Sequence, residues 1–291
     1  MGSAVTDWFK ELLISLLQTL FDNAAQFMEL GFTDGLADLY KTPAEAVGSG
    51  VLAAIQNVSQ VSIQPVGYVI LTYVLCYDLI TACINGNNFR DFDTAIFFKF
   101  ALKGGIATYL MGKATTIAFA FFDLGSEMAA KSKGVLNITA AASSSLYSTS
   151  FETLLQEKEL GFLIGLVLLA LLLYLVMLAM YIVIFVVLLG RAMEVMVYCT
   201  LAPIPVATLT NREWGSIGNN YLKSLAALAF QVILIMVVLG IFMGLMTGIM
   251  SAASSIDDLP KKTLTCIAYG VVLCFTVLKT GSISKSIFNA H

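Results

Sequence analysis

Residues 160–190 read LGFLIGLVLLALLLYLVMLAMYIVIFVVLLG and contain no charged side chain. Glu159 precedes this stretch and Arg191 follows it. As an α-helix, the stretch would be roughly 46 Å long at about 1.5 Å per residue, whereas the hydrocarbon core of a bilayer is about 30 Å thick. A helix that is apolar on every face is buried in a large protein or in lipid, and this length favours lipid. The sequence therefore predicts a transmembrane helix here.

The composition of the whole chain is that of a membrane protein. Hydrophobic residues make up 58% of the 291 residues and charged residues only 12%, far from the values of soluble proteins. The net charge is −3, so the chain has no excess of basic residues, the feature by which nucleic-acid-binding proteins are recognised. The five cysteines are Cys76, Cys83, Cys199, Cys266 and Cys274. All lie in apolar segments, which predicts buried thiols rather than disulfides or metal ligands.

Five apolar stretches are predicted to be membrane spans. They cover residues 66–84, 95–124, 160–190, 225–250 and 264–278. A long polar loop, residues 125–159, separates the second span from the third. Residues 192–209 are apolar, but Pro203 and Pro205 each remove a backbone donor, which predicts a broken or re-entrant segment. The predicted fold class is therefore all-α, a polytopic membrane protein with about five transmembrane helices.

An N-terminal region, residues 1–64, precedes the predicted transmembrane domain, residues 65–291. Within it, residues 5–29 repeat apolar positions with helical period, and the opposite face is polar and acidic. This pattern predicts an amphipathic helix rather than a span. The acidic face does not favour attraction to anionic lipid. The helix is expected either to pack on the protein's own membrane face or on a partner, or to lie in the membrane interface.

Motifs for catalysis are missing from the sequence. The single histidine, His291, is the last residue, so the sequence cannot supply a histidine-based metal site, a catalytic triad or a proton relay. The glycine-rich nucleotide-binding motifs and the G-x-S-x-G motif of hydrolases are also absent. We therefore expect a protein that is not an enzyme and that uses no cofactor or metal.

Three lysines interrupt the second predicted span, and ionisable residues inside a span are candidates for function. At about 100° per residue, Lys103 lies roughly 40° from Lys99 in one direction and Lys113 roughly 40° in the other. One stripe of the helix therefore carries all three, as expected for a helix that lines a wet pathway. The alternative is that Lys99 and Lys103 extend to the lipid headgroups and leave Lys113 alone.

Asp78, in the first predicted span, is a candidate partner for Lys113. In an antiparallel hairpin of the first two spans, both side chains would fall near the middle of the membrane, within roughly 3–5 Å along its normal. Each charge would compensate the other, and removing one would strand its partner at a high energetic cost. The sequence therefore predicts an intramembrane Asp78–Lys113 ion pair.

Glycines spaced four residues apart occur in two of the predicted spans. They are Gly161 and Gly165 in the third span and Gly240, Gly244 and Gly248 in the fourth. Small residues at this spacing let two helices approach closely. The pattern predicts tight helix packing, either within one chain or between subunits.

Polar residues and prolines follow the long apolar stretch. They are Arg191, Glu194, Pro203, Pro205, Arg212, Glu213, Trp214 and Lys223. Arg191 and Glu194 stand three residues apart and are expected to pair on one helix face. The residues around Trp214 are expected to form a polar interfacial surface where a partner docks. The alternative is an ordinary loop with an aromatic membrane anchor.

The order of these residues resembles a known family. The motif runs from Arg191 and Glu194 through Leu201-Ala202-Pro203-Ile204-Pro205, Arg212-Glu213, Gly218 and Tyr221-Leu222-Lys223 to Gln231. It resembles the TrbL-like polytopic inner-membrane components of type IV secretion systems, in the branch found on conjugative elements of Gram-positive bacteria. Together with the amphipathic N-terminus and the spans, the resemblance covers nearly the whole chain.

The resemblance implies a multi-pass subunit of a DNA-transfer channel in the bacterial plasma membrane. It implies an N-terminus outside the cell and a cytoplasmic C-terminus; the basic residues of the loops do not decide the orientation by themselves. It also implies a homo-oligomer that assembles with other type IV secretion membrane subunits and with cytoplasmic ATPases.

We therefore expect a channel or scaffold subunit of a conjugation machine. In an oligomer, the stripe of Lys99, Lys103 and Lys113 would line a path for the phosphate backbone of transferred single-stranded DNA. The alternative is a stand-alone small-molecule transporter or channel. Such proteins usually carry internal inverted repeats, and the sequence contains no convincing repeat.

Overall fold

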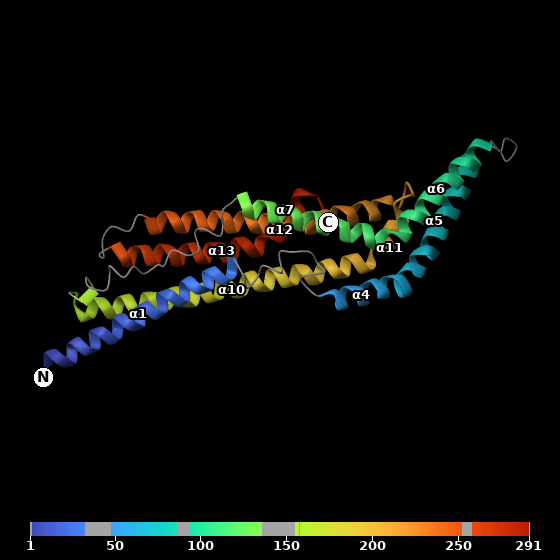
Figure 1. Ribbon diagram of the computed structural model, residues 1–291. Helices are drawn as coiled ribbons and strands as arrows, with labels where there is room; N and C mark the ends of the chain where they lie inside the picture. Colours follow the sequence, from blue (N-terminus) through green and yellow to red (C-terminus); the bar gives the residue numbers. More distant parts are fainter. Residues whose placement is uncertain are drawn as a thin grey trace. The chain divides into compact units, whose positions relative to one another are not determined.

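A computed structural model describes residues 2–32, 48–85, 94–135, 155–156, 158–251 and 258–290. These residues form helices and no β-strand (Figure 1). In chain order, the helices are α1 (Gly2–Phe32), α4 (Ser49–Val58), the π-helix η1 (Ser59–Ile63), α5 (Gln64–Asn85), α6 (Thr94–Gly112), α7 (Ala114–Val135), α10 (Leu160–Leu201), α11 (Pro203–Thr208), α12 (Gly215–Ser251) and α13 (Leu259–Ile287).

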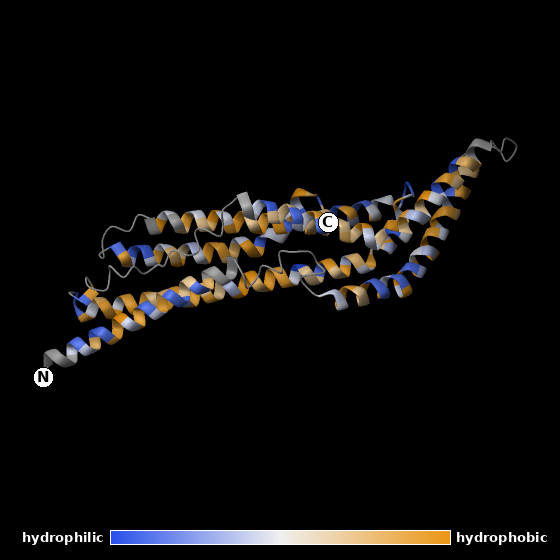
Figure 2. Ribbon diagram, in the orientation of Figure 1, coloured by the Kyte–Doolittle hydropathy of each residue, from blue (hydrophilic) through white to orange (hydrophobic). Residues whose placement is uncertain are grey.

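Four helical stretches of the described residues are long and apolar enough to cross a membrane. They are Ser49–Ile84, Leu160–Leu201, Gly215–Met246 and Leu259–Ile287. A fifth candidate is the pair Phe97–Gly112 and Ala114–Ser132, whose halves are bent by 60°. Hydrophobic residues predominate along these stretches (Figure 2). The prediction of an all-α, multi-pass membrane protein is therefore confirmed.

The long apolar stretch forms most of α10. Its buried residues recur every three or four positions, as on one face of a helix. They include Leu163, Leu166, Ala170, Leu173, Met177, Met180 and Ile184. Apolar residues between them are exposed, for example Leu168 at 62% and Val186 at 57%. One stripe of α10 therefore packs on the protein, and its other faces are suited to contact with lipid.

The fold divides into two compact units. Unit 1 comprises Met1–Tyr40, Ala129–Leu188 and Ile233–Thr280, and unit 2 comprises Lys41–Met128, Leu189–Val232 and Gly281–His291.

In unit 1, the N-terminal helix α1 packs on the protein itself. Phe21 is buried, and the ring centroid of Phe27 lies 5.5 Å from that of Tyr174 in α10. Lys10 Nζ donates a hydrogen bond to the carbonyl oxygen of Gln156 at 3.2 Å. Of the two placements that the sequence left open for this helix, these contacts favour packing on the protein over a helix held by the membrane interface alone.

In unit 2, α7 packs closely against α10 and α12. Phe122 of α7, Cys199 of α10 and Leu225 of α12 belong to one buried apolar cluster. At Gly125 in α7, an added Cβ atom would lie 2.5 Å from the carbonyl oxygen of Ala229 in α12. Because Cβ atoms do not approach a carbonyl oxygen so closely, only glycine allows this contact between the two backbones.

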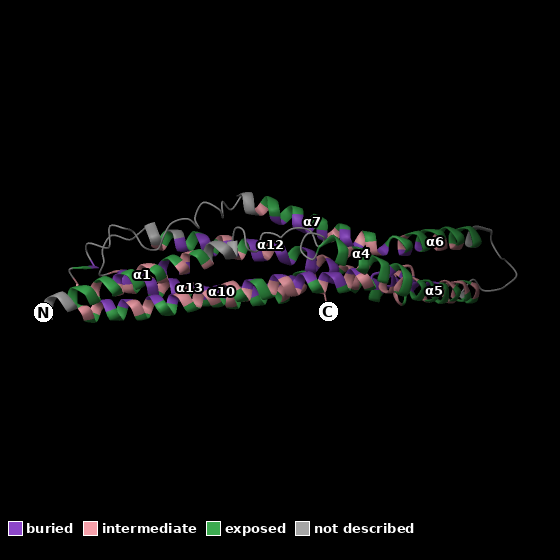
Figure 3. Cartoon of the chain, turned by 60° about the horizontal axis from the view of Figure 1, so that its bottom comes forward, coloured by how far each residue is buried: buried purple, intermediate pink, exposed green. Residues whose placement is uncertain are grey.

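The helices α5 and α6 of unit 2 form an antiparallel hairpin. A Cβ atom added at Gly104 would lie 3.7 Å from Leu75, and one added at Gly112 would lie 3.4 Å from the hydroxyl of Tyr68. Residue numbers therefore increase along α6 in the direction in which they decrease along α5, so the two helices are antiparallel. Much of the hairpin surface is exposed (Figure 3).

The second predicted span, residues 95–124, is broken rather than continuous. The break falls at Lys113, whose N–H contacts the carbonyl oxygens of both Tyr109 and Leu110 at 3.2 Å. Such a shared bond tightens the last turn of α6, and the flexible backbone of Gly112 allows the change of direction. The helix α7 then continues to Val135, into the predicted loop 125–159, because this part of the loop is rich in good helix formers such as alanine, glutamate and lysine.

The predicted broken segment, residues 192–209, is helical over most of its length. α10 runs through these residues to Leu201, and the helix is interrupted at Ala202, directly before Pro203, where the backbone keeps helical dihedral angles. Proline cannot donate a backbone hydrogen bond, so Pro203 and Pro205 each remove one donor from the helical pattern. The interruption is therefore confined to Ala202, and α11, a helix of 6 residues, begins at Pro203 and contains both prolines.

Candidate functional site

The proline segment packs against the α5–α6 hairpin. α11 contacts both helices of the hairpin. At Gly67 in α5, an added Cβ atom would lie 3.1 Å from the carbonyl oxygen of Pro203 and 3.2 Å from the sulfur of Met111. Pro203 is the first residue of α11, a position where the missing N–H costs no helical hydrogen bond. This packing holds the following turn, residues 209–214, beside α5.

One carboxylate connects the hairpin to that turn. Lys103 Nζ of α6 donates to Asp78 Oδ2 of α5 at 2.5 Å, and Asn211 Nδ2 of the turn donates to Asp78 Oδ1 at 2.9 Å. The side chain of Asp78 is only 17% exposed, and Asn211 is buried. We call Asp78, Lys103 and Asn211 the Asp78 hub.

Asn211 also shapes the backbone that leads into α12. Its side-chain oxygen accepts hydrogen bonds from the backbone N–H groups of Glu213 at 2.7 Å and Trp214 at 3.0 Å. An asparagine that bonds the backbone two or three residues later forms an Asx-type turn, which satisfies free donors at the start of a helix. The Asp78 hub therefore fixes both the hairpin and the entry to α12.

The predicted Asp78–Lys113 pair is wrong, because Asp78 pairs with Lys103. In the hairpin, Gly112 lies beside Tyr68, so Lys113 is roughly 15 Å from the level of Asp78 at about 1.5 Å per residue. The prediction measured depth from the middle of one continuous span, but α6 ends at the break before α7.

Trp214 is stacked between two tyrosines of α5. Its ring centroid lies 5.3 Å from that of Tyr73 and 5.4 Å from that of Tyr77, with interplanar angles of 10° and 18°. The hydroxyl of Tyr77 donates to Glu213 Oε2 at 2.7 Å. Glu213 and Trp214, predicted to dock a partner, therefore contact α5 of their own chain, whereas the neighbouring Arg212 is exposed.

Arg191 and Glu194 each bond to another helix rather than to each other. Arg191 is 6% exposed, and its Nε donates to the carbonyl oxygen of Leu228 in α12 at 3.1 Å. Glu194 Oε1 lies 3.2 Å from Lys285 Nζ in α13. The expected local pair is therefore replaced by contacts that join α10 to α12 and to α13.

Ser59, the buried first residue of the π-helix η1, contacts the end of α10 and the start of α7. Its hydroxyl donates to the carbonyl oxygen of Thr200, in the last turn of α10, at 2.9 Å. Its oxygen lies 2.7 Å from the hydroxyl of Thr115, in the first turn of α7. Because the single proton of Ser59 goes to Thr200, Thr115 is the donor in the second bond. Carbonyls in the last turn of a helix lack helical partners, so Ser59 satisfies one where the chain turns towards Pro203.

The remaining predicted site residues lie as follows. Lys99 is exposed on α6 and Lys113 is exposed at the break between α6 and α7, whereas Lys103 is held by Asp78. The carbonyl oxygen of Pro205 accepts a hydrogen bond from Thr208 Oγ1 at 2.8 Å, and Lys223 is exposed on α12.

The glycines spaced by four do not mark the close contacts within this chain. A Cβ atom added at Gly161, Gly165, Gly244 or Gly248 would meet nothing within 4 Å, and Gly240 is half-buried. Close backbone approaches occur instead at isolated glycines: Gly67, Gly125 and Gly218, where an added Cβ would lie 2.7 Å from the carbonyl oxygen of Pro205. Isolated glycines carry no spacing signal, so the four-residue spacing did not identify them.

The described residues contain no group of three histidine, cysteine, aspartate or glutamate side chains that could hold a metal ion. Cys199 and Cys266 are buried, as predicted, whereas Cys83 and Cys274 are half-buried and Cys76 in α5 is exposed. The site offers ion pairs, hydrogen bonds and stacked rings between helices, which are means of holding and coupling segments.

Comparison with family models gives a match over residues 34–203, to the family described as TrbL/VirB6 plasmid conjugal transfer like protein. The matched region covers more than half of the chain. It includes both helices of the hairpin, Arg191, Glu194 and Pro203, and ends before Pro205 and the turn that holds Asn211. No curated protein matches, and no solved structure matches.

Proposed function

The protein belongs to the TrbL/VirB6 family of plasmid conjugal transfer proteins, and from this membership we propose that it is a channel or scaffold subunit of a conjugative type IV secretion system. The family match, on a chain with four or five candidate spans, carries the proposal. The subunit acts in the plasma membrane, with its N-terminus outside and its C-terminus in the cytoplasm. It performs no catalysis of its own and relies on cytoplasmic ATPases for energy.

The Asp78 hub supports a scaffold role for the hairpin. It joins α5 and α6 to the turn that carries Arg212 and Glu213, through one carboxylate that accepts two hydrogen bonds. A partner that contacts the exposed Arg212 would therefore act on a turn held rigidly against the hairpin. We assign this turn as the docking point for another transfer-system protein, such as an ATPase.

Lys99 and Lys113 are the proposed contacts to the transferred strand. Lys99 is exposed on α6 and Lys113 is exposed at the break that follows it. In a homo-oligomer of this chain they would present positive charge to a phosphate backbone. Lys103 instead neutralises Asp78 and positions the hairpin. Lys99→Gln together with Lys113→Gln is expected to lower DNA transfer, whereas Lys279→Gln on α13 serves as the matched control. Unchanged transfer by the double variant, at normal membrane levels, would refute the lining role.

The proposal is tested by deleting the gene from the conjugative element and measuring transfer from the resulting donor cells. We expect transfer to be lost and to return when the protein is supplied in trans. Transfer that persists without the protein would overturn the proposal. The purified protein, reconstituted alone in vesicles, is expected to carry no small-molecule flux, and such flux would favour the stand-alone transporter.

A further inference from the structure

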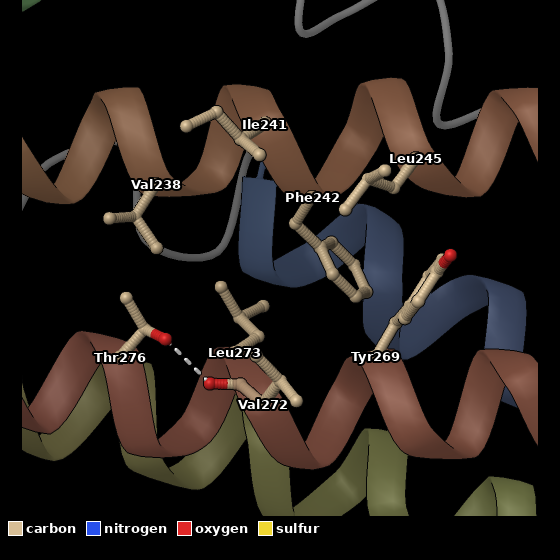
Figure 4. A pocket seen from close by; sticks show the side chains of 8 residues that line it. All are labelled: Val238, Ile241, Phe242, Leu245, Tyr269, Val272, Leu273 and Thr276. Carbon is tan, nitrogen blue, oxygen red and sulfur yellow. Dashed lines mark hydrogen bonds between the residues drawn. The ribbon is translucent and has the colours of Figure 1, made fainter.

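An apolar groove lies between α12 and α13 in unit 1 (Figure 4). It is lined by Val238, Ile241, Phe242 and Leu245 of α12 and by Tyr269, Val272, Leu273 and Thr276 of α13. The Thr276 hydroxyl donates to the carbonyl oxygen of Val272 at 2.8 Å, so it requires no partner in the groove. The only other polar side-chain atom of the lining is the hydroxyl of Tyr269, which lies at one end (Figure 4).

The dimensions of the groove fit a hydrocarbon chain rather than a helix. From Tyr269 to Thr276 it extends about 10 Å at 1.5 Å per residue. Its empty volume is about 410 Å³, counting the open side, which over that length corresponds to a width of at most about 7 Å. A helix with its side chains is about 10–12 Å across. A single hydrocarbon chain is much thinner, because carbon atoms in contact are only about 4 Å apart.

The groove-lining stripe of α13 continues to an exposed cation. At about 100° per residue, Lys261, Thr265, Tyr269, Val272 and Thr276 all fall within roughly 80° of the helix circumference. Lys261 is exposed and lies in the first turn of α13. The stripe is therefore charged at the helix end and apolar further along.

The length of this stripe matches half a bilayer. Lys261 and Thr276 are about 22 Å apart along the helix. One leaflet, with its headgroups, is about 20–22 Å thick, since a whole bilayer measures about 40–45 Å. With Lys261 at the headgroup level, the groove falls at the depth of the acyl chains.

From the apolar lining, the narrow width and the cation at headgroup depth, we propose that this groove binds one anionic phospholipid of the surrounding bilayer. An acyl chain lies along Val272 and Ile241, and the phosphate contacts Lys261. The site is independent of the proposed role in DNA transfer, because it requires only that the protein resides in a membrane.

The experiment uses the full chain in nanodiscs that contain phosphatidylglycerol or phosphatidylcholine, each with a photoactivatable group in the acyl chain. Crosslinked residues are mapped by mass spectrometry. Val272→Trp fills the groove at a position that is 60% exposed, and Val271→Trp is its matched control on the adjacent, also exposed, position. Lys261→Gln removes the headgroup contact, and Lys279→Gln is its control near the other end of α13.

We expect crosslinks to be concentrated on the groove residues. Crosslinking should be on the order of fivefold stronger for phosphatidylglycerol than for phosphatidylcholine, because this is the effect of one lysine near an anionic lipid. Val272→Trp should abolish this concentration and Lys261→Gln should remove the lipid preference, while both controls leave it unchanged. Crosslinks spread evenly over all exposed apolar residues would overturn the proposal, since they would indicate ordinary lipid contact. Disulfide crosslinking of a Val272→Cys variant to a second copy, with the lipid excluded, would also overturn it.

Discussion

Replacing Asp78 with asparagine removes the charge of the Asp78 hub while keeping the size of the side chain. The carboxylate accepts one hydrogen bond from Lys103 and one from Asn211. An asparagine at this position still offers one oxygen, so the bond from Asn211 can persist. The bond from the charged lysine is then lost, because the amide NH2 group cannot accept it, and Lys103 is left without its counter-ion.

The expected loss of stability follows from these two bonds and from their burial. Hydrogen bonds to charged groups contribute about 1.5–3 kcal/mol, and a fully buried pair that loses one partner costs about 3–5 kcal/mol. The side chain of Lys103 is 38% exposed, so its ammonium regains water in the variant and the cost falls below the fully buried value. We expect Asp78→Asn to destabilise the protein by about 1–2 kcal/mol, a decrease in Tm of roughly 3–6 °C.

Trp214 provides a direct assay for this change, because it stacks on α5 next to Asp78. The chain has two tryptophans, so a Trp8→Phe background leaves Trp214 as the single reporter. Thermal unfolding in detergent, followed by its fluorescence, is compared for Asp78→Asn, Lys103→Met and the double variant. We expect the two substitutions to be coupled by at least about 1 kcal/mol.

The matched control is the combination of Asp78→Asn with Lys113→Met. Residues at this separation should give additive effects, within about 0.5 kcal/mol. Coupling to Lys113 in place of Lys103 would refute the hairpin register, and additivity for both pairs would refute the Asp78 hub.

Three further predictions concern stability. Gly125→Ala should cost about 1–3 kcal/mol because the new methyl group meets a backbone carbonyl 2.5 Å away. Gly165→Ala, with nothing within 4 Å, should stabilise α10 by about 0.5–1 kcal/mol. Tm values in detergent check both, and equal effects would contradict the close approach. Ser59→Ala should cost about 1–3 kcal/mol, because it leaves a carbonyl and a hydroxyl without their partner, and a Tm equal to the wild-type value would argue against this contact. Glu194→Lys or Lys285→Glu should each cost at most about 1 kcal/mol, since both side chains are at least 40% exposed. The double charge reversal should recover this loss; a double variant without recovery would show that the two side chains do not interact.

The fold class could be predicted from the sequence because apolar runs of membrane length have no other common explanation. The stretch 160–190 identified α10 without reference to any partner. The boundaries of the individual helices were less predictable. The break at Lys113 depends on one backbone turn beside Gly112, and nothing in the local composition distinguishes it from a continuous helix.

The residues of the candidate site could be predicted, but most of their partners could not. Asp78 and Lys103 were both identified as intramembrane charges, yet their pairing depends on the register of α5 against α6, which single-helix periodicity does not contain. Asn211 gave no signal, because polar side chains near a proline-containing loop are ordinary. Tyr77 gave none, because it is one of several tyrosines in the first predicted span. Their roles arise only from the packing of α11 and the following turn on the hairpin.

Transfer frequency from donor cells that make only the Asp78→Asn variant is the most direct test of the account, because it asks whether conjugation depends on the contact between the hairpin and the turn. The variant must be present in the membrane at the wild-type level, and Lys279→Gln serves as the control. A destabilisation of about 1.4 kcal/mol lowers tenfold the ratio of molecules with the Asp78 hub formed to molecules with it broken. We therefore predict a clear reduction in transfer for the variant and none for the control. Equal transfer by the two strains would contradict the account.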